Sequence, residues 1–465
     1  MTDEPARPSR LPQAARLWRY GLAAGYLTIL GLNLPGHLSA DSVISLWEGR
    51  SGVRMVWGPP MYSAILGFFD RIVPGASLYL AACALLIFAS WAGLRTLRPR
   101  TAWTGPALLA GVLLLPIVLV YQGTVWKDVL FANLTIAGFV CLAHAALRFG
   151  TRRRWAPLAG ALVFFAFGCL VRQNGAITTV FAAMALAWAA RGGGWRASAL
   201  WGLAGFAAPL ALAALLNTVT PVRTPPDLPK LDQGVRMVQH YDIAAAVAAD
   251  PKRPLKALEA DNPAATAVLR LTAREAYSPV RSDEMKKSKP FMESIWSYSG
   301  PAVSTQWRQI VFTDPTGYVW RRLQIFRWVF MTPRLELCLP VHLGSMGPPE
   351  VEAKLGMPTQ VERRDSKLFN YATWFFWSPA SSHVFWAIAA LACIIALLHR
   401  RQGADVAVAA MLGSALAFGG SFAMISIACD YRYLYLVDLS AITGLLYLAL
   451  DPPTIGRRRR AEASP

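Results

Sequence analysis

The chain has 465 residues, of which 55% are hydrophobic and only 16% are charged, and its formal net charge is +19. Its mean hydropathy is +0.36. Soluble domains carry about 25% charged residues, so this composition excludes an ordinary soluble protein and predicts an integral membrane protein. In a soluble protein, such a large positive net charge would indicate binding to nucleic acid. Here many arginines flank hydrophobic segments, where they set orientation, and no nucleic-acid partner is expected.

The hydrophobic segments predict an all-α polytopic membrane protein with about ten transmembrane helices. A cleaved signal peptide is the weaker alternative for the first segment. The apolar stretch 59–73 is too short to cross roughly 30 Å of hydrocarbon, which favours a re-entrant or interfacial helix. The expected spans are 17–34, 75–97, 103–121, 128–148, 155–171, 175–190, 197–217, 383–399, 405–428 and 433–450.

The distribution of arginines predicts the orientation. Arginines crowd one set of span ends, as in Arg95–Arg100, Arg152–Arg154 and Arg457–Arg460, and are sparse in the short loops of the other side. By the positive-inside rule both termini lie in the cytoplasm, and the loops 36–62, 121–128 and 172–174 face outward. The arginine- and alanine-rich composition is typical of a GC-rich bacterium. The expected location is therefore the bacterial inner membrane, with the outer face towards the periplasm.

Four parts are expected along the chain. Residues 1–218 form an N-terminal transmembrane module with a long first outer loop (35–74) that contains interfacial helices, and 219–381 form a mixed, mainly helical periplasmic domain. Residues 382–451 hold the last transmembrane helices and 452–465 a basic cytoplasmic tail. In the outer domain, Asp314 as N-cap and Pro315 as first helical residue predict an amphipathic helix that lies on the membrane.

The six cysteines show no metal-ligand spacing. Cys83, Cys141, Cys169 and Cys393 fall inside expected spans. Cys338 and Cys429 fall on the expected outer face, where a disulfide between them is one alternative and two free thiols the other. Within the outer domain, the patch 239–242 contains a His beside an Asp, for which a structural role is favoured.

The first outer loop, residues 36–62, is too long and too rich in reactive side chains for a tether between helices. It contains Asp41 and Ser42, Trp57, and a Pro-Pro turn that leads through Pro60 to Tyr62. Because ionisable groups at the hydrocarbon boundary are costly, Asp41 is a candidate functional residue.

Three further polar clusters fall on the same expected face: Trp126-Lys127-Asp128, Arg172-Gln173-Asn174 and Asp430–Tyr433. Each has an ordinary explanation, because Asp128 and Asn174 suit helix N-caps and arginines and tyrosines suit the interface. Their common face favours one shared site. Asp438 lies deeper in the last span and is expected to neutralise Arg432 or Arg172, or to form a structural ion pair.

The order of these motifs resembles the GT-C superfamily of membrane glycosyltransferases. Its bacterial members carry an acid soon after the first span, a Pro-Pro-x-Tyr turn and a Lys-Asp pair that opens a later span. They also carry an Arg-x-Asn-Gly turn and an Arg-Tyr pair before the last span. The resemblance covers most of the membrane part and does not reach 219–381. Several branches carry a second acid where this chain has Ser42.

The resemblance implies transfer of a sugar from a polyprenyl-phosphate carrier to a hydroxyl of a glycolipid, glycan or protein on the outer face. Asp41 would be the general base, and Lys127, Arg172 and Arg432 would bind the donor phosphate. A divalent metal is not expected, since cationic side chains already meet the monophosphate. Residues expected to contact sugar or lipid, or to support the site, are Ser42, Trp57, Pro60, Tyr62, Trp126, Asp128, Asn174, Tyr431 and Tyr433.

Two other function classes remain open. A polymerase or ligase of lipid-linked glycans would also be an outer-face enzyme with many spans, but it would not need the acid of the first loop. A flippase or transporter would place ionisable groups near the bilayer midplane and would show internal repeats. Neither feature is visible in the sequence.

Overall fold

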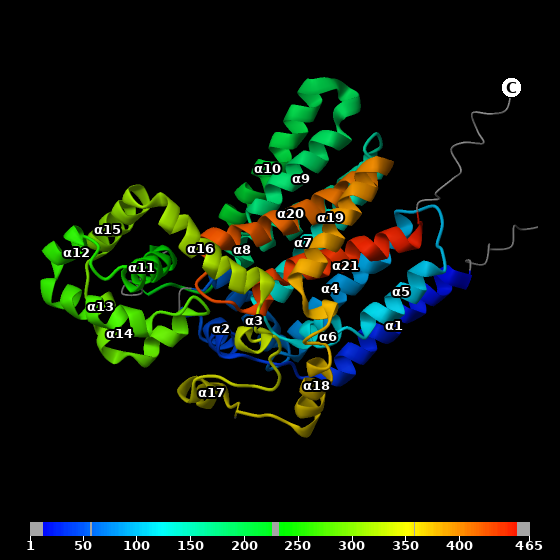
Figure 1. Ribbon diagram of the computed structural model, residues 1–465. Coiled ribbons are helices and arrows are strands. Elements are labelled where there is room, and N and C mark those ends of the chain that lie inside the picture. The colour runs from blue at the N-terminus through cyan, green and yellow to red at the C-terminus, as the bar shows by residue number, and fades with distance from the viewer. Residues whose placement is uncertain (1–12, 56–57, 226–231, 358, 453–465) are drawn as a thin grey trace, which may run out of the picture.

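The computed structural model describes residues 13–55, 58–225, 232–357 and 359–452 (Figure 1). These ranges contain helices and isolated β-bridges but no strand. The helices of the N-terminal part are α1 (Gln13–Asn33), α2 (Ala40–Ser51), α3 (Pro60–Ile72), α4 (Ser77–Thr96), α5 (Thr104–Leu113), α6 (Pro116–Leu119), η1 (Tyr121–Gly123), α7 (Lys127–Leu147), η2 (Arg152–Arg154), α8 (Trp155–Val171), α9 (Ile177–Ala189), η3 (Arg191–Gly193) and α10 (Gly194–Thr218).

The second half of the chain is also helical, and its longest described connection is residues 339–348, between η5 and α17. The helices are α11 (Asp232–Ala249), α12 (Lys256–Asp261), α13 (Pro263–Ala276), η4 (Ser282–Lys287), α14 (Lys289–Trp296), α15 (Gly300–Thr313), α16 (Pro315–Met331), η5 (Leu335–Cys338), α17 (Pro349–Leu355), α18 (Arg363–Thr373), η6 (Pro379–Ser381), α19 (His383–Arg400), α20 (Gly403–Ile425), η7 (Tyr431–Leu434) and α21 (Tyr435–Leu450).

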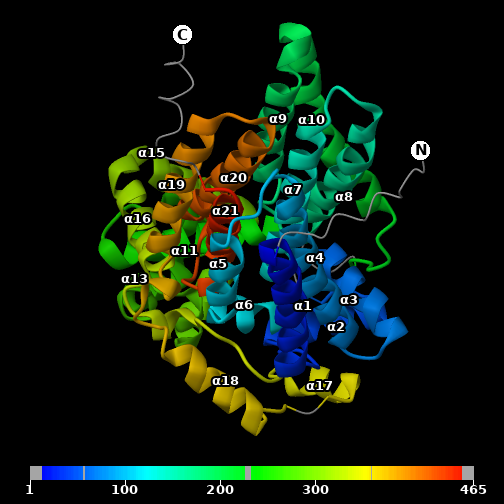
Figure 2. The same ribbon diagram turned by 90° about the vertical axis from the view of Figure 1, so that its right-hand side faces the viewer.

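The two helices α7 and α21 form the centre of the membrane part (Figure 2). Helices α4, α8 and α20 pack on α7, and α19 and α5 pack on α21. Both central helices are mostly apolar on all faces, as expected for helices enclosed by others. Helix α7 begins within the cluster Trp126-Lys127-Asp128, and α21 begins just after the cluster Asp430–Tyr433, so the centre of the bundle places those clusters close together.

Seven described helices are long and apolar enough to cross a membrane, and a bent pair would make an eighth. The chain is therefore an all-α, multi-pass membrane protein, but the expected count of ten spans is not confirmed. Helix α9 has only 13 residues because the turn that begins at Arg172 takes up the start of the expected span. Helix α1 has 21 residues but does not meet the same criterion, and it carries Arg16 and Arg19.

The expected span 103–121 is broken. Helix α5 and the segment Pro116–Gly123 meet at 74°. Pro116 explains the break, because a proline cannot donate the helical hydrogen bond and disfavours helical geometry in the residue before it. The bend turns residues 121–126 under the bundle, where they reach the first outer loop.

Helices α2 and α3 form a tight hairpin in the first outer loop. Backbones meet at Gly49 and Gly67: a Cβ on Gly49 would lie 2.1 Å from the Ser63 carbonyl oxygen. The Arg50 guanidinium also binds both carboxylate oxygens of Asp70, at 2.7 and 2.9 Å. With 13 residues, α3 is not among the candidate spans. The hairpin holds the helix that carries Asp41.

Gly49→Ala is expected to destabilise the protein by about 3 kcal/mol, because the new methyl group has no space between two backbones. Thermal unfolding of the purified protein in detergent would measure the effect. Gly111→Ala is the matched control, since a Cβ there meets nothing within 4 Å and α5 would gain helix propensity. Equal melting temperatures for the two variants would contradict the assigned hairpin contact.

The expected outer domain has two parts with different cores. Helices α11–α15 surround an apolar core of their own, and they form the separate lobe in Figure 1. Residues from Val329 to Tyr371 instead pack against the membrane bundle. The described part of 219–381 contains helices and isolated β-bridges but no strand, which agrees with the expectation of a mainly helical domain. Asp314 caps α16 by accepting a hydrogen bond from the Gly317 N–H, as predicted.

Candidate functional site

Three short backbone segments cross beneath the bundle and position the candidate site. The first outer loop pairs with the 121–126 turn, where the His37 N–H donates to Gly123 and the Val125 N–H to His37, at 3.0 and 2.9 Å. On its other side, Leu38 pairs with residues 344–346. We call residues 37–38, 124–125 and 344–346 the strap. It fixes the start of α2 beside the start of α7.

Asp41 contacts Arg432 across most of the chain length. The carboxylate lies in the first turn of α2, and one Arg432 guanidinium nitrogen donates to it at 2.6 Å. The Asp41 side chain is 60% exposed, whereas that of Arg432 is only 13% exposed. The guanidinium also lies over the Trp126 ring, 5.1 Å from its centroid. The exposed acid is therefore held by a largely buried cation.

The pKa of Asp41 lies below its ordinary value. Partial removal from water by the surrounding protein raises this pKa, but the charges of Arg432 and Lys127 lower it by more. Asp41 is thus ionised at neutral pH. The same shift adds stability above the unfolded pKa of about 3.9, and this stability is lost as pH falls through the lower folded value.

Arg432 links three carboxylates. Besides Asp41, it donates to Asp430 at 3.3 Å, and its Nε lies 3.9 Å from Asp128. Asp128 in turn forms an ion pair with Arg172, and Asp430 with Arg281. The carboxylates Asp41, Asp128 and Asp430 thus face four cations, Lys127, Arg172, Arg281 and Arg432. This charged cluster has one positive charge in excess, which favours an anionic ligand.

Arg172 reaches the charged cluster from a pocket of aromatic rings. Its guanidinium lies 5.6, 5.3 and 5.4 Å from the ring centroids of Phe418, Phe422 and Tyr433. Asn174, two residues on, donates to the Ser421 hydroxyl at 2.9 Å. Neither Asn174 nor Asp128 is an N-cap, because Ala176 and Trp126 occupy those positions. Both polar residues therefore serve contacts between helices.

The other predicted residues surround the charged cluster and hold its backbone in place. Ser42 and Tyr62 both donate to the Val125 carbonyl oxygen. Burial raises the pKa of the Tyr62 hydroxyl far above its usual range, so it remains a donor. Pro60 is the first residue of α3, and the Trp126 indole N–H donates to the Ser39 hydroxyl. Trp57 lies outside the described residues.

Tyr431 and Tyr433 flank Arg432 and stack on neighbouring helices. Tyr433 stacks on Phe422, and Tyr431 on His383 at a centroid distance of 4.0 Å. His383 Nδ1 is 2.9 Å from an Asp438 oxygen, and both side chains are fully buried. Of the two alternatives for Asp438, the pairing with Arg432 or Arg172 is not found, and the buried pair with His383 agrees with the structural one. The arginines of the charged cluster already form ion pairs with acids at the outer ends of the helices, so Asp438 pairs with a histidine instead.

The sequence did not point to two residues that lie near the charged cluster. Arg281 belongs to the outer domain, which carries no motif, and only folding brings it to Asp430. His342 lies 6.2 Å from the Trp126 ring, and burial lowers its pKa. A lone histidine in an unmatched domain gives no signal in the sequence.

Contacts from the outer domain hold the turn that carries Asp430 and Arg432, and we call these contacts the clasp. Cys338 and Cys429 form a disulfide, and Cys429 also donates its backbone N–H to Val280. Arg322 donates to the Ser426 carbonyl and to Asp242, at 2.8 and 2.7 Å. The patch 239–242 thus includes a buried ion pair at the base of this clasp, as favoured for a structural role.

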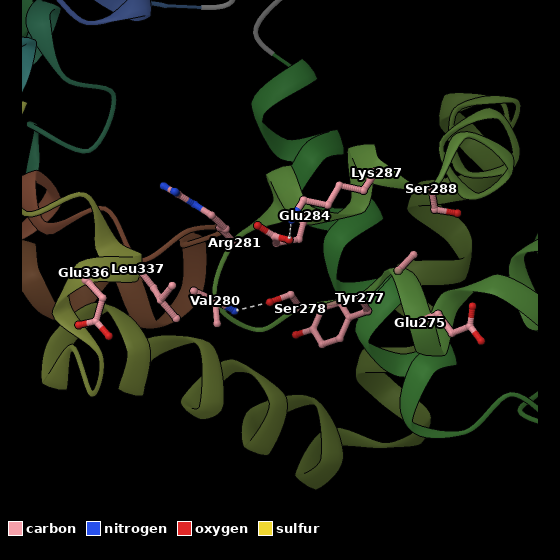
Figure 3. A pocket seen from close by; sticks show the side chains of 11 residues that line it. Glu275, Tyr277, Ser278, Val280, Arg281, Glu284, Lys287, Ser288, Glu336 and Leu337 are labelled. Carbon is pink, nitrogen blue, oxygen red and sulfur yellow. Dashed lines mark hydrogen bonds and ion pairs between the residues drawn. The ribbon is translucent and has the colours of Figure 1, made fainter.

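A cavity of about 650 Å³ opens beside this clasp (Figure 3). Glu284 and Lys287 lie on one side of it, and Tyr277 and Ser278 on the other. Arg281 belongs to its lining and extends towards Asp430. The cavity therefore adjoins the charged cluster through one arginine. Within the described ranges, no three His, Cys, Asp or Glu side chains gather as metal ligands.

Comparison with known proteins does not identify this chain. No protein-family model matches it, and no curated protein sequence matches it either.

Proposed function

We propose that this protein is a membrane glycosyltransferase that moves a sugar from a polyprenyl-phosphate carrier to an acceptor hydroxyl. The observation that carries the proposal is the Asp41–Arg432 contact of 2.6 Å within a cluster that has one cation in excess. A solvent-accessible carboxylate beside fixed cations matches the needs of this reaction. It requires a proton acceptor on one side of the anomeric carbon and positive charge where the phosphate leaves.

In the proposed reaction, the acceptor oxygen attacks the anomeric carbon as the bond to the phosphate oxygen breaks. Asp41 takes the hydroxyl proton, and the electron pair of the broken bond stays on the polyprenyl phosphate. Lys127, Arg172 and Arg432 bind this phosphate, the arginines through paired N–H groups. The phosphate would compete with Asp41 for Arg432. Donor binding would thereby raise the basicity of Asp41 when the base is needed.

The cavity beside Arg281 gives a route for the acceptor. It is open, has hydroxyl and carboxylate groups on its walls, and adjoins Asp430. The proposal specifies the acceptor only as a molecule that bears a hydroxyl group, which includes glycolipids, glycans and proteins. Trp57, in the same loop as Asp41, would stack on a sugar face.

A transfer assay tests the proposal. Purified protein in nanodiscs would receive a radiolabelled hexose or pentose on polyprenyl monophosphate, together with glycolipids extracted from bacterial membranes. The expected result is label in the acceptor with stoichiometric release of polyprenyl phosphate. A donor that stays intact with every acceptor would contradict the proposal.

The buried His383–Asp438 pair favours a second candidate, a flippase for lipid-linked glycans, because fully buried ionisable pairs are typical of transport pathways. The same nanodisc protein, reconstituted into liposomes, separates the two. A flippase would move a fluorescent lipid-linked glycan between leaflets without breaking its phosphate bond.

The predicted periplasmic orientation can be tested through the oxidation state of Cys338 and Cys429. If the charged cluster faces the periplasm, Cys338 and Cys429 are oxidised in cells, since disulfides persist on that side. Alkylation of denatured, unreduced protein should then modify only Cys83, Cys141, Cys169 and Cys393, the free cysteines of the described chain. Mass spectrometry of the peptides measures this. Alkylated Cys338 and Cys429 would place the face in a reducing compartment.

A further inference from the structure

Residues 369–377 are rich in aromatic side chains, and we call them the aromatic segment. Six of these nine residues are Phe, Tyr or Trp. They run from the last turns of α18 into the connection to α19. Helix α18 lies beyond the α6 end of the bundle in both views (Figures 1 and 2). The segment belongs to no candidate span of the described chain, and the function proposed above does not use it.

The aromatic segment contains packed rings and exposed rings. Tyr371 and Phe376 pack against the apolar core of the bundle. The exposed rings are those of Phe369, Trp374 and Trp377, whose exposed fractions are 43%, 81% and 76%. Apolar surface of this extent is costly in water, and such patches mark contacts with proteins or membranes. The exposed rings are therefore expected to contact another molecule or a membrane.

Two hydrogen bonds fix the level of the aromatic segment along the bundle. The Tyr371 hydroxyl donates to the Leu114 carbonyl at 2.6 Å, directly after the last residue of α5. The Trp386 indole N–H, in the first turn of α19, donates to the Ala380 carbonyl at 3.0 Å. Helix α19 is a candidate span, and α5 belongs to the bent pair that would make another. The segment thus lies where these helices meet the boundary of the hydrocarbon layer.

The exposed rings also adjoin side chains of these helices that face lipid. The Trp374 and Tyr371 rings are 6.2 Å apart, and Leu114, to which Tyr371 is bonded, has an exposed side chain. On the α19 side, the exposed ring of Phe385 packs on Trp386 at a centroid distance of 4.9 Å. Exposed apolar side chains of membrane-crossing helices contact lipid. Lipid at this level therefore reaches the aromatic segment without any further partner.

The charges next to the exposed rings fit a phospholipid surface. Arg363, Lys367 and Trp374 follow at intervals of four and seven residues, which places them on one face of α18 and its last turn. Both cations are exposed. Within the described ranges, the ion pairs of α18 involve Arg364 and Asp365 rather than these two cations. Tryptophan is enriched at the headgroup level of bilayers, and lysine and arginine extend to the phosphates there.

We propose that the aromatic segment inserts into the phospholipid headgroup layer of the bilayer, with Phe369, Trp374 and Trp377 as the rings that enter it. Lys367 lies at the level of the lipid phosphates. The lobe α11–α15 stays in water, so the two parts of the outer domain differ in their contact with the membrane. This surface is separate from the charged cluster, and the proposal holds whichever reaction the cluster performs.

Photolabelling by lipid tests the proposal on the unmodified chain. Wild-type protein in single-copy nanodiscs would be irradiated with phosphatidylcholine that carries a diazirine either near the glycerol or at the end of an acyl chain. Tandem mass spectrometry then locates the adducts. We expect adducts in the aromatic segment mainly from the glycerol-level probe, and at Ile395, an exposed residue of α19, mainly from the chain-end probe. Leu271 on α13 is as exposed as Trp374, at 81%, and should remain unlabelled by both.

Fluorescence quenching gives a second readout. Lipids brominated close to the glycerol should quench tryptophan emission less in the double variant Trp374→Phe and Trp377→Phe than in the wild type. Trp296→Phe, at a half-exposed ring of the lobe, is the matched control and should leave the quenching unchanged.

Three outcomes would overturn the proposal. An unlabelled aromatic segment beside a labelled Ile395, with quenching unchanged in the double variant, would place the exposed rings in water. Stronger labelling of the segment by the chain-end probe would place it in the hydrocarbon layer. Labelling that occurs in single-copy nanodiscs but is lost in liposomes crowded with the protein would assign the rings to a contact with a second copy of the chain.

Discussion

Asp41→Asn is expected to lower kcat for sugar transfer by at least about 100-fold, because general-base catalysis contributes about 10²–10⁴-fold. The donor Kd should not rise, since the phosphate no longer competes with a carboxylate for Arg432. The amide has nearly the shape of the carboxylate and still accepts a hydrogen bond from Arg432, but it cannot take the acceptor proton. Single-turnover transfer with saturating donor measures the chemical step directly.

Asp283→Asn is the matched control, since it makes the same change at an exposed acid of the outer domain whose partner is Lys286. It should transfer at the wild-type rate. A near-normal rate for Asp41→Asn would remove Asp41 from the role of base. His342, whose ring centroid lies 6.2 Å from that of Trp126, would become the next residue to change.

Arg432→Gln is expected to have the larger combined effect. It leaves Asp41, Asp128 and Asp430 without a shared cation. Asp128 and Asp430 are buried, and breaking buried pairs costs about 3 kcal/mol or more. It also removes a donor to the leaving phosphate, which lowers kcat by about 10²–10³-fold. Thermal unfolding and single-turnover transfer separate the two losses.

Arg432→Lys separates charge from geometry. It keeps the positive charge and should unfold close to the wild-type temperature. Lysine lacks the planar pair of N–H groups that binds phosphate and carboxylate together, so transfer should still fall by more than about 10-fold. Wild-type transfer by Arg432→Lys would show that a point charge suffices at this position.

The pH dependence of transfer follows from the pKa of Asp41. In the wild type, Arg432 and Lys127 hold this pKa below its usual value, so Asp41 should cause no loss of rate between pH 5 and 8. In Arg432→Gln, less positive charge opposes the effect of desolvation on Asp41, so the pKa of Asp41 rises. The acid limb of the pH–rate profile should therefore move to higher pH, and an unmoved limb would assign that limb to another group.

Local patterns in the sequence were enough to predict several features. Low charge and long apolar runs predict a multi-pass helical membrane protein, because the hydrocarbon core admits few other folds. Asp314 and Pro315 predict the start of α16, because capping depends on adjacent residues. The polar clusters around Lys127, Arg172 and Arg432 are visible because charged residues are conspicuous at the ends of apolar helices.

Only the tertiary structure decided how those residues pair. Asp41 and Arg432 are 391 positions apart, and no local rule selects this partner from the other acids and cations near the outer ends of the helices. Asp438 shows the difficulty, since it pairs with His383 rather than with an arginine. Pro116 is plain in the sequence, but the bend that brings residues 121–126 beneath the bundle depends on packing. Helix formation is set by neighbours in the chain, whereas the charged cluster, the clasp through Arg281 and the strap depend on contacts between distant segments.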